Sequence, residues 1–230
     1  CIRDREEVIK KHPQDYFGYY GLGDYWKLEG ENELALANFS KSIELFPYYW
    51  RSYIHRAEIY ERMGQPRKAI NDYTELLAGK PNEKKAYLNR AILLVKHFQK
   101  FEAAHRDLNS AISIYPKYEQ AHLNKGVIYE KEGKVVEALN TYNKGIDLLP
   151  ESALLHRYRA ALHHAQNETE LAMKDYTQAI ALDPKYGEAL FLRSRLMMDL
   201  KRFEDARQDA LKARELGYPV KPEYLEQLSK

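Results

Sequence analysis

Residues 50–83 read WRSYIHRAEIYERMGQPRKAINDYTELLAGKPNE, and this stretch carries a pattern that recurs along the chain. Tyr53 and Ala57 lie four residues apart, and Ala69 and Tyr73 repeat that spacing further on. Side chains four residues apart share one face of an α-helix. The stretch therefore predicts two consecutive helices, each with one small and one aromatic residue on its buried face.

Prolines reveal the period of the repeat. Successive members of the series are 34 or 35 residues apart: Pro13, Pro47, Pro81, Pro116, Pro150 and Pro184. An alanine stands twelve residues before each of the last five: Ala35, Ala69, Ala104, Ala138 and Ala172. With Tyr16 as position 1, the register holds for six units once one extra residue is allowed between His97 and Ala104. A period of this length is the signature of a repeat protein.

The columns of this register have a physical reading as helix pairs. Position 8 is always small: Gly23, Ala57, Ala91, Gly126, Ala160 and Ser194. Small residues there and in the alanine column let two helix backbones approach, while rings at positions 4, 11 and 24 fill the space beside the contact. Gly30, Gly64 and Gly133 are expected to end the first helix of their units, and the proline of each unit ends the second. No stretch alternates long enough to predict a sheet, so the fold class is all-α.

Arginine and aspartate recur together within the units. Position 7 is Arg56, Arg90, Arg159 and Arg193, and position 23 of the same units is Asp72, Asp107, Asp175 and Asp209. Units without this arginine also lack the aspartate. Because a guanidinium fork matches a carboxylate, we predict an ion pair from the first helix to the second in these four units. This reading removes the arginines from the candidates for ligand binding.

The pattern resembles the tetratricopeptide repeat family over residues 16–217, most clearly in the second unit, where Gly64 and Pro81 also stand at the family's spacings. The resemblance implies a right-handed α-solenoid of helix pairs with a concave inner surface. The six repeats are expected at 16–49, 50–83, 84–118, 119–152, 153–186 and 187–217. Residues 1–15 are expected to be the second helix of a partial preceding repeat, and residues 218–230 a C-terminal capping helix.

Composition limits the classes of function. The chain has 230 residues, with 36 Lys and Arg against 34 Asp and Glu in mixed order, so no nucleic-acid partner is expected. No apolar stretch is long enough for a membrane span, which predicts a soluble chain. One cysteine excludes an intrachain disulfide and a cysteine-rich metal site. His156 and His163 fall in ring positions of the repeat and read as packing. We expect no catalytic residue, metal or cofactor.

Within the family, positions 2, 5, 6, 9, 12 and 13 of the first helix line the concave face. In the first unit these are Phe17, Tyr20, Gly21, Asp24, Lys27 and Leu28. An apolar floor and two asparagine amides at one repeat position suit an extended peptide backbone. The predicted peptide-binding groove consists of Arg51, Ile54, His55, Leu88, Asn89, Ile92, Leu123, Asn124, Val127, Arg157 and Tyr158.

The leading functional hypothesis is a non-catalytic scaffold or adaptor that binds an extended protein segment in this groove. The alternative is a bacterial cell-envelope lipoprotein anchored through Cys1, with an assembly or secretion role. Residues 1–12 also fit the start of a fragment cut from a longer array, so the fragment and the lipoprotein both stay open. A third hypothesis is a regulatory arm of a longer enzyme. A clamp for acidic chaperone C-termini is disfavoured, because position 5 has no lysine and position 9 no asparagine. The sequence does not define partner, compartment or oligomeric state.

Overall fold

The structure, a computed structural model, describes residue 7 and residues 9–228. Over this part of the chain it contains helices and turns and no strand, as the sequence predicts. The chain divides into two compact units, residues 1–116 and residues 117–230. Each unit is described by itself below.

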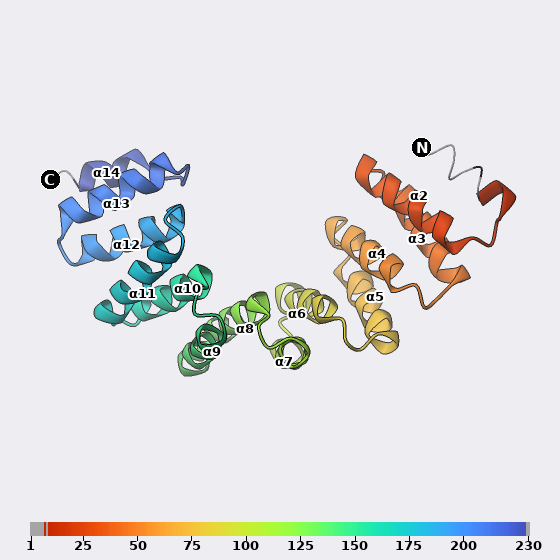
Figure 1. Ribbon diagram of the computed structural model, residues 1–230, viewed down its shortest axis with the longest axis horizontal. Coiled ribbons are helices and arrows are strands. Elements are labelled where there is room, and N and C mark those ends of the chain that lie inside the picture. The colour runs from red at the N-terminus through yellow and green to blue at the C-terminus, as the bar shows by residue number, and fades with distance from the viewer. Residues whose placement is uncertain (1–6, 8, 229–230) are drawn as a thin grey trace. The chain divides into compact units, whose positions relative to one another are not determined.

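Antiparallel helix pairs joined by short turns build both units (Figure 1). The helices of the first unit are α2 (Tyr16–Glu29), α3 (Asn32–Leu45), α4 (Trp50–Arg62), α5 (Pro66–Gly79), α6 (Lys84–Phe98) and α7 (Phe101–Ile114). Those of the second unit are α8 (Glu119–Lys131), α9 (Val135–Leu148), α10 (Ala153–Ala165), α11 (Thr169–Leu182), α12 (Gly187–Asp199), α13 (Phe203–Glu215) and α14 (Pro222–Gln227). The first helices of the pairs are thus α2, α4 and α6, then α8, α10 and α12.

The turn within each pair uses a left-handed backbone conformation. Gly30, Gly64 and Gly133 take φ angles of 83°, 67° and 73°, which confirms the predicted stop signals. At the equivalent place in the other pairs, Gln99, Asn167 and Lys201 take the same conformation despite their side chains. Asparagine adopts this conformation readily, but for Gln99 and Lys201 the repeat imposes a backbone shape that the residue type does not favour.

The core of each pair forms where small residues meet rings, as the register predicts. The alanine column is fully buried, and Tyr73, Tyr142 and Tyr176 have no exposed surface. Their rings lie against position 8 of the same unit. A Cβ atom added to Gly126 would come within 2.2 Å of Cε1 of Tyr142, so no larger residue fits without displacing that ring.

The predicted arginine–aspartate ion pairs are confirmed in all four units. In the second repeat, Arg56 donates from Nε and Nη2 to Oδ2 and Oδ1 of Asp72, at 2.9 and 2.6 Å. Arg90–Asp107, Arg159–Asp175 and Arg193–Asp209 have the same two-pronged geometry. Each arginine also donates from Nη1 to the second helix of the preceding repeat, where the acceptors are Ser40, Thr74, Asn143 and Thr177. Every such guanidinium therefore ties three helices together.

The structure describes more of the C-terminal end of the chain than of the N-terminal end. At the C-terminal end, α14 packs with Val220 and Leu228 against α12 and α13, and the hydroxyl groups of Tyr224 and Ser194 lie 2.8 Å apart. At the N-terminal end, residues 1–6 and 8 of the expected partial repeat, Cys1 among them, lie outside the described residues.

Candidate functional site

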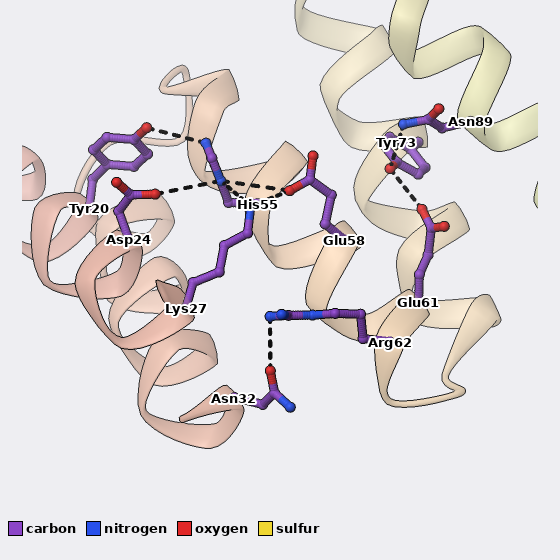
Figure 2. Close-up of polar contacts among 10 residues, drawn as sticks. All are labelled: Tyr20, Asp24, Lys27, Asn32, His55, Glu58, Glu61, Arg62, Tyr73 and Asn89. Carbon is purple, nitrogen blue, oxygen red and sulfur yellow. Dashed lines mark hydrogen bonds and ion pairs between the residues drawn. The ribbon is translucent and has the colours of Figure 1, made fainter. Parts of the chain in front are cut away.

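The first-helix face of the first unit is the surface of α2, α4 and α6 that carries repeat positions 2, 5, 6, 9, 12 and 13. Figure 2 shows the polar side chains that meet there. At its centre is His55 of α4, whose ring stacks on Phe39 with centroids 5.5 Å apart. From α2, the ammonium group of Lys27 lies 2.7 Å from Nδ1 of His55 and forms an ion pair with Glu58. This network joins the first helices of two consecutive repeats.

The contacts of His55 define its protonation. An ammonium group only donates, so Nδ1 accepts from Lys27 and the proton lies on Nε2, which donates to the Tyr20 hydroxyl at 3.3 Å. Burial lowers the pKa of His55, and the charge of Lys27 lowers it further, against the opposing effect of Glu58 and Asp24. The imidazole is therefore neutral in the neutral pH range. Carboxylate oxygens of Glu58 and Asp24 lie 3.8 and 3.9 Å from Nδ1.

A second polar chain connects α4 with the following repeat. The buried Tyr73 hydroxyl donates to Oε1 of Glu61 at 2.8 Å and accepts from Nδ2 of Asn89 at 3.1 Å. Burial raises the pKa of Glu61, and the Tyr73 hydrogen bond opposes that shift. Toward the preceding repeat, Arg62 of the same face donates to Oδ1 of Asn32, the first residue of α3, at 2.9 Å (Figure 2).

The equivalent face of the second unit lies on α8, α10 and α12 and uses different residues. Arg157 of α10 forms an ion pair with Glu188 of α12, and its guanidinium lies 4.1 Å from the centroid of the Tyr158 ring. His164 of α10 contacts Asp199 of α12 at 2.9 Å. Neighbouring first helices are again bridged by side chains of the inner positions.

The residues of the predicted groove differ in accessibility. Leu88 is only 7% exposed and belongs to the core, whereas Ile92 is 36% exposed on the same helix. Ile54, Leu123 and Val127 are half-buried. The asparagine amides are engaged within the chain: Asn89 donates to Tyr73, and Asn124 donates to the Gln120 carbonyl oxygen at 2.8 Å. Their side-chain oxygens are the groups left to accept from a peptide.

Two features are absent from the described part of the chain. No three His, Cys, Asp or Glu side chains there lie close enough together to hold a metal ion. No helix there combines the length and the hydropathy that crossing a membrane requires.

Comparison with known proteins identifies the repeat. A sequence profile described as tetratricopeptide repeat matches residues 98–153 and 159–217, and a second profile with the same description matches residues 51–83. The chain belongs to the tetratricopeptide repeat family. A curated relative, Tetratricopeptide repeat protein 6 of Homo sapiens, is 26% identical over 190 residues. That match covers 81% of this chain and 36% of the human protein, so the chain spans about a third of its relative's length.

Solved structures of other tetratricopeptide repeat proteins show the same α-solenoid fold. The structure titled "Functional Characterization of Pseudomonas Aeruginosa pilF" aligns with a TM-score of 0.71 at 22% identity, over 99% of this chain and all of that one. YrrB, titled "a TPR protein with an unusual peptide-binding site", aligns with a TM-score of 0.64 at 19% identity, over 83% of this chain and 97% of that one. At these identities the likeness concerns the fold.

The network around His55 was only partly visible in the sequence. The register had placed Tyr20, Lys27 and Glu58 at inner positions, but the predicted groove included His55 alone of this cluster. The sequence signal for the other members of this network is the stagger between the first helices of consecutive repeats. Lys27 at position 12 and Glu58 at position 9 lie on neighbouring first helices, where staggered positions meet.

Proposed function

We propose that this chain is a non-catalytic scaffold that binds an extended segment of a partner protein along its first-helix faces. The observation that carries the proposal is the exposure of apolar side chains on the face of the first unit. Phe17 is 57% exposed and Ile92 is 36% exposed, at positions 2 and 9 of their repeats. Neither residue is needed for the contacts between the two helices of a pair. Exposed apolar side chains flanked by polar groups are typical of protein-binding surfaces.

The polar groups beside them support a peptide rather than a small molecule as the ligand. The face presents carbonyl oxygens of asparagine side chains, carboxylates and cationic groups spread over three helices, instead of converging on one enclosed cavity. Membership of the tetratricopeptide repeat family and the peptide-binding site named for YrrB agree with this proposal.

Site-specific photo-crosslinking tests the proposal. A photoreactive phenylalanine analogue placed at Ile92 should form a crosslink to a partner in native extract, and mass spectrometry should map that crosslink to a single continuous segment. The matched control is the same analogue at Val136, which is 68% exposed in the first turn of α9, a second helix of its pair. Crosslinks of equal yield at Val136, or none at Ile92, would contradict binding along the first-helix face.

A further inference from the structure

Three carboxylates lie on the first-helix face of the first unit, and each has a neighbour within the chain. Glu58 forms an ion pair with Lys27, and Glu61 accepts the Tyr73 hydrogen bond. Asp24 lies 3.9 Å from the His55 ring. Only Glu58 is paired with a cation, because tyrosine and the neutral imidazole carry no positive charge, so Asp24 and Glu61 keep their negative charge.

The same face also carries four cations besides Lys27. The four are Arg51, Lys85, Arg62 and Lys96, and all are exposed. The guanidinium carbon of Arg51 lies 5.3 Å from the centroid of the Trp50 ring, and Arg62 donates to the neutral amide of Asn32. Among the described residues, none of the four forms an ion pair with a carboxylate. Because these four cations outnumber Asp24 and Glu61, the two carboxylates without an ion pair, the face carries an excess of positive charge.

These cations form two rows with an apolar strip between them. Arg51 and Lys85 occupy position 2 of consecutive first helices, and Arg62 and Lys96 occupy position 13. Eleven residues of helix separate the rows, which is about 16 Å. The exposed Ile92 lies between them. An extended peptide covers this distance in about five residues.

We propose that the segment bound by this face is acidic, with carboxylate side chains about five residues apart and an aliphatic residue between them that packs on Ile92. This inference rests on the proposed scaffold function and specifies the chemistry of its partner. Complementary charge would guide the encounter and fix the register, while the apolar contact supplies affinity. The carboxylates of Asp24, Glu58 and Glu61 between the rows make the face a poor match for the continuous charge of a nucleic-acid backbone.

Peptide phage display on the whole chain tests this inference. Selected peptides should be rich in Asp and Glu around Leu, Ile, Val or Phe, and their binding should weaken as salt increases. The double variant Arg51→Glu/Lys85→Glu should bind a selected peptide about tenfold or more weakly. The control Lys174→Glu/Arg207→Glu makes the same change in net charge on exposed second-helix residues and should bind within about twofold of the parent.

Each other outcome overturns the inference in a distinct way. Neutral, basic or proline-rich peptides that crosslink at Ile92 would leave the scaffold function standing and remove its acidic partner. Selection of no peptide, or of peptides that never crosslink at Ile92, would remove both. Equal losses in the two double variants, or tighter binding of a single-stranded oligonucleotide than of any peptide, would also overturn the proposal. Circular dichroism melting curves of the variants verify that the exposed substitutions leave the fold intact.

Discussion

The strongest energetic prediction concerns the pair Arg90 and Asp107, which joins α6 to α7. The two side chains share hydrogen bonds of 2.8 and 2.7 Å, and Arg90 also reaches Thr74 on α5 at 3.0 Å. The perturbations are Arg90→Met, Asp107→Leu and the combination of both. Each single change leaves a charged group in a largely dry site without its partner, whereas the double change removes both charges.

The burial of the two side chains gives the size of the effect. The Asp107 side chain is 8% exposed and the Arg90 side chain 19% exposed, so water replaces the lost partner only in part. Removal of one member of a buried pair costs about 3 kcal/mol or more of unfolding free energy. Replacement of both by apolar residues of similar volume should cost about 1 kcal/mol or less, because no unpaired charge remains.

Urea unfolding followed by circular dichroism measures these free energies in a double-mutant cycle. The control cycle uses Arg202 and Asp205, a pair of the same residue types with side chains about half exposed, where the coupling should be no more than about 0.5 kcal/mol. The reasoning fails if the Arg90→Met/Asp107→Leu chain loses the sum of the single losses, or if the exposed pair couples as strongly as the buried one.

Three other perturbations follow from the fold. Gly126→Ala should cost about 2 kcal/mol of stability because the new methyl group would overlap the Tyr142 ring. Gly79→Ala, where the new methyl group meets open space, should not destabilise the protein. Equal melting temperatures for the two variants would be inconsistent with the packing described. Lys201→Gly should raise stability by about 1 kcal/mol, since φ there is 60°; a loss in chemical denaturation would refute this. The pKa of His55 is lowered on folding, so below about pH 6.5 the unfolded chain binds more protons than the folded chain, and the free energy of unfolding should fall as the pH falls. His55→Gln should reduce this pH dependence. An unchanged dependence would exclude His55 as its source.

Much of the fold was predictable because the repeat expresses one packing solution six times. A ring at position 24 needs a small residue at position 8, and the sequence shows this pairing in Tyr73 with Ala57 and in Tyr142 with Gly126. The ion pairs were predictable for a similar reason: arginine and aspartate appear and disappear together. The repeats of one chain can be compared with each other as related sequences would be, because chance does not place arginine and aspartate together in the same four units.

The candidate site was less predictable because a repeat register assigns a face but not the accessibility of each side chain. Leu88 and Ile92 both fall at inner positions of α6, yet Leu88 is buried and Ile92 is exposed. The register also says nothing of competition for hydrogen bonds. The amide of Asn89 was expected to meet a ligand, but its nitrogen donates to the Tyr73 hydroxyl, which the core brings to the same face.

The contrast between constant and variable positions carries the functional argument further. Position 8 and the alanine column are small in every unit because the helix crossing leaves no room for larger side chains. Position 9, by contrast, changes from Asp24 and Glu58 through Ile92 and Val127 to Ala161 and Arg195. If the proposed scaffold function holds, position 9, which packing restricts less, is where the chemistry presented to a partner differs between repeats. A scaffold built this way can change its ligand by substitutions at positions 2, 9 and 13 while the contacts that hold the helix pairs together stay the same.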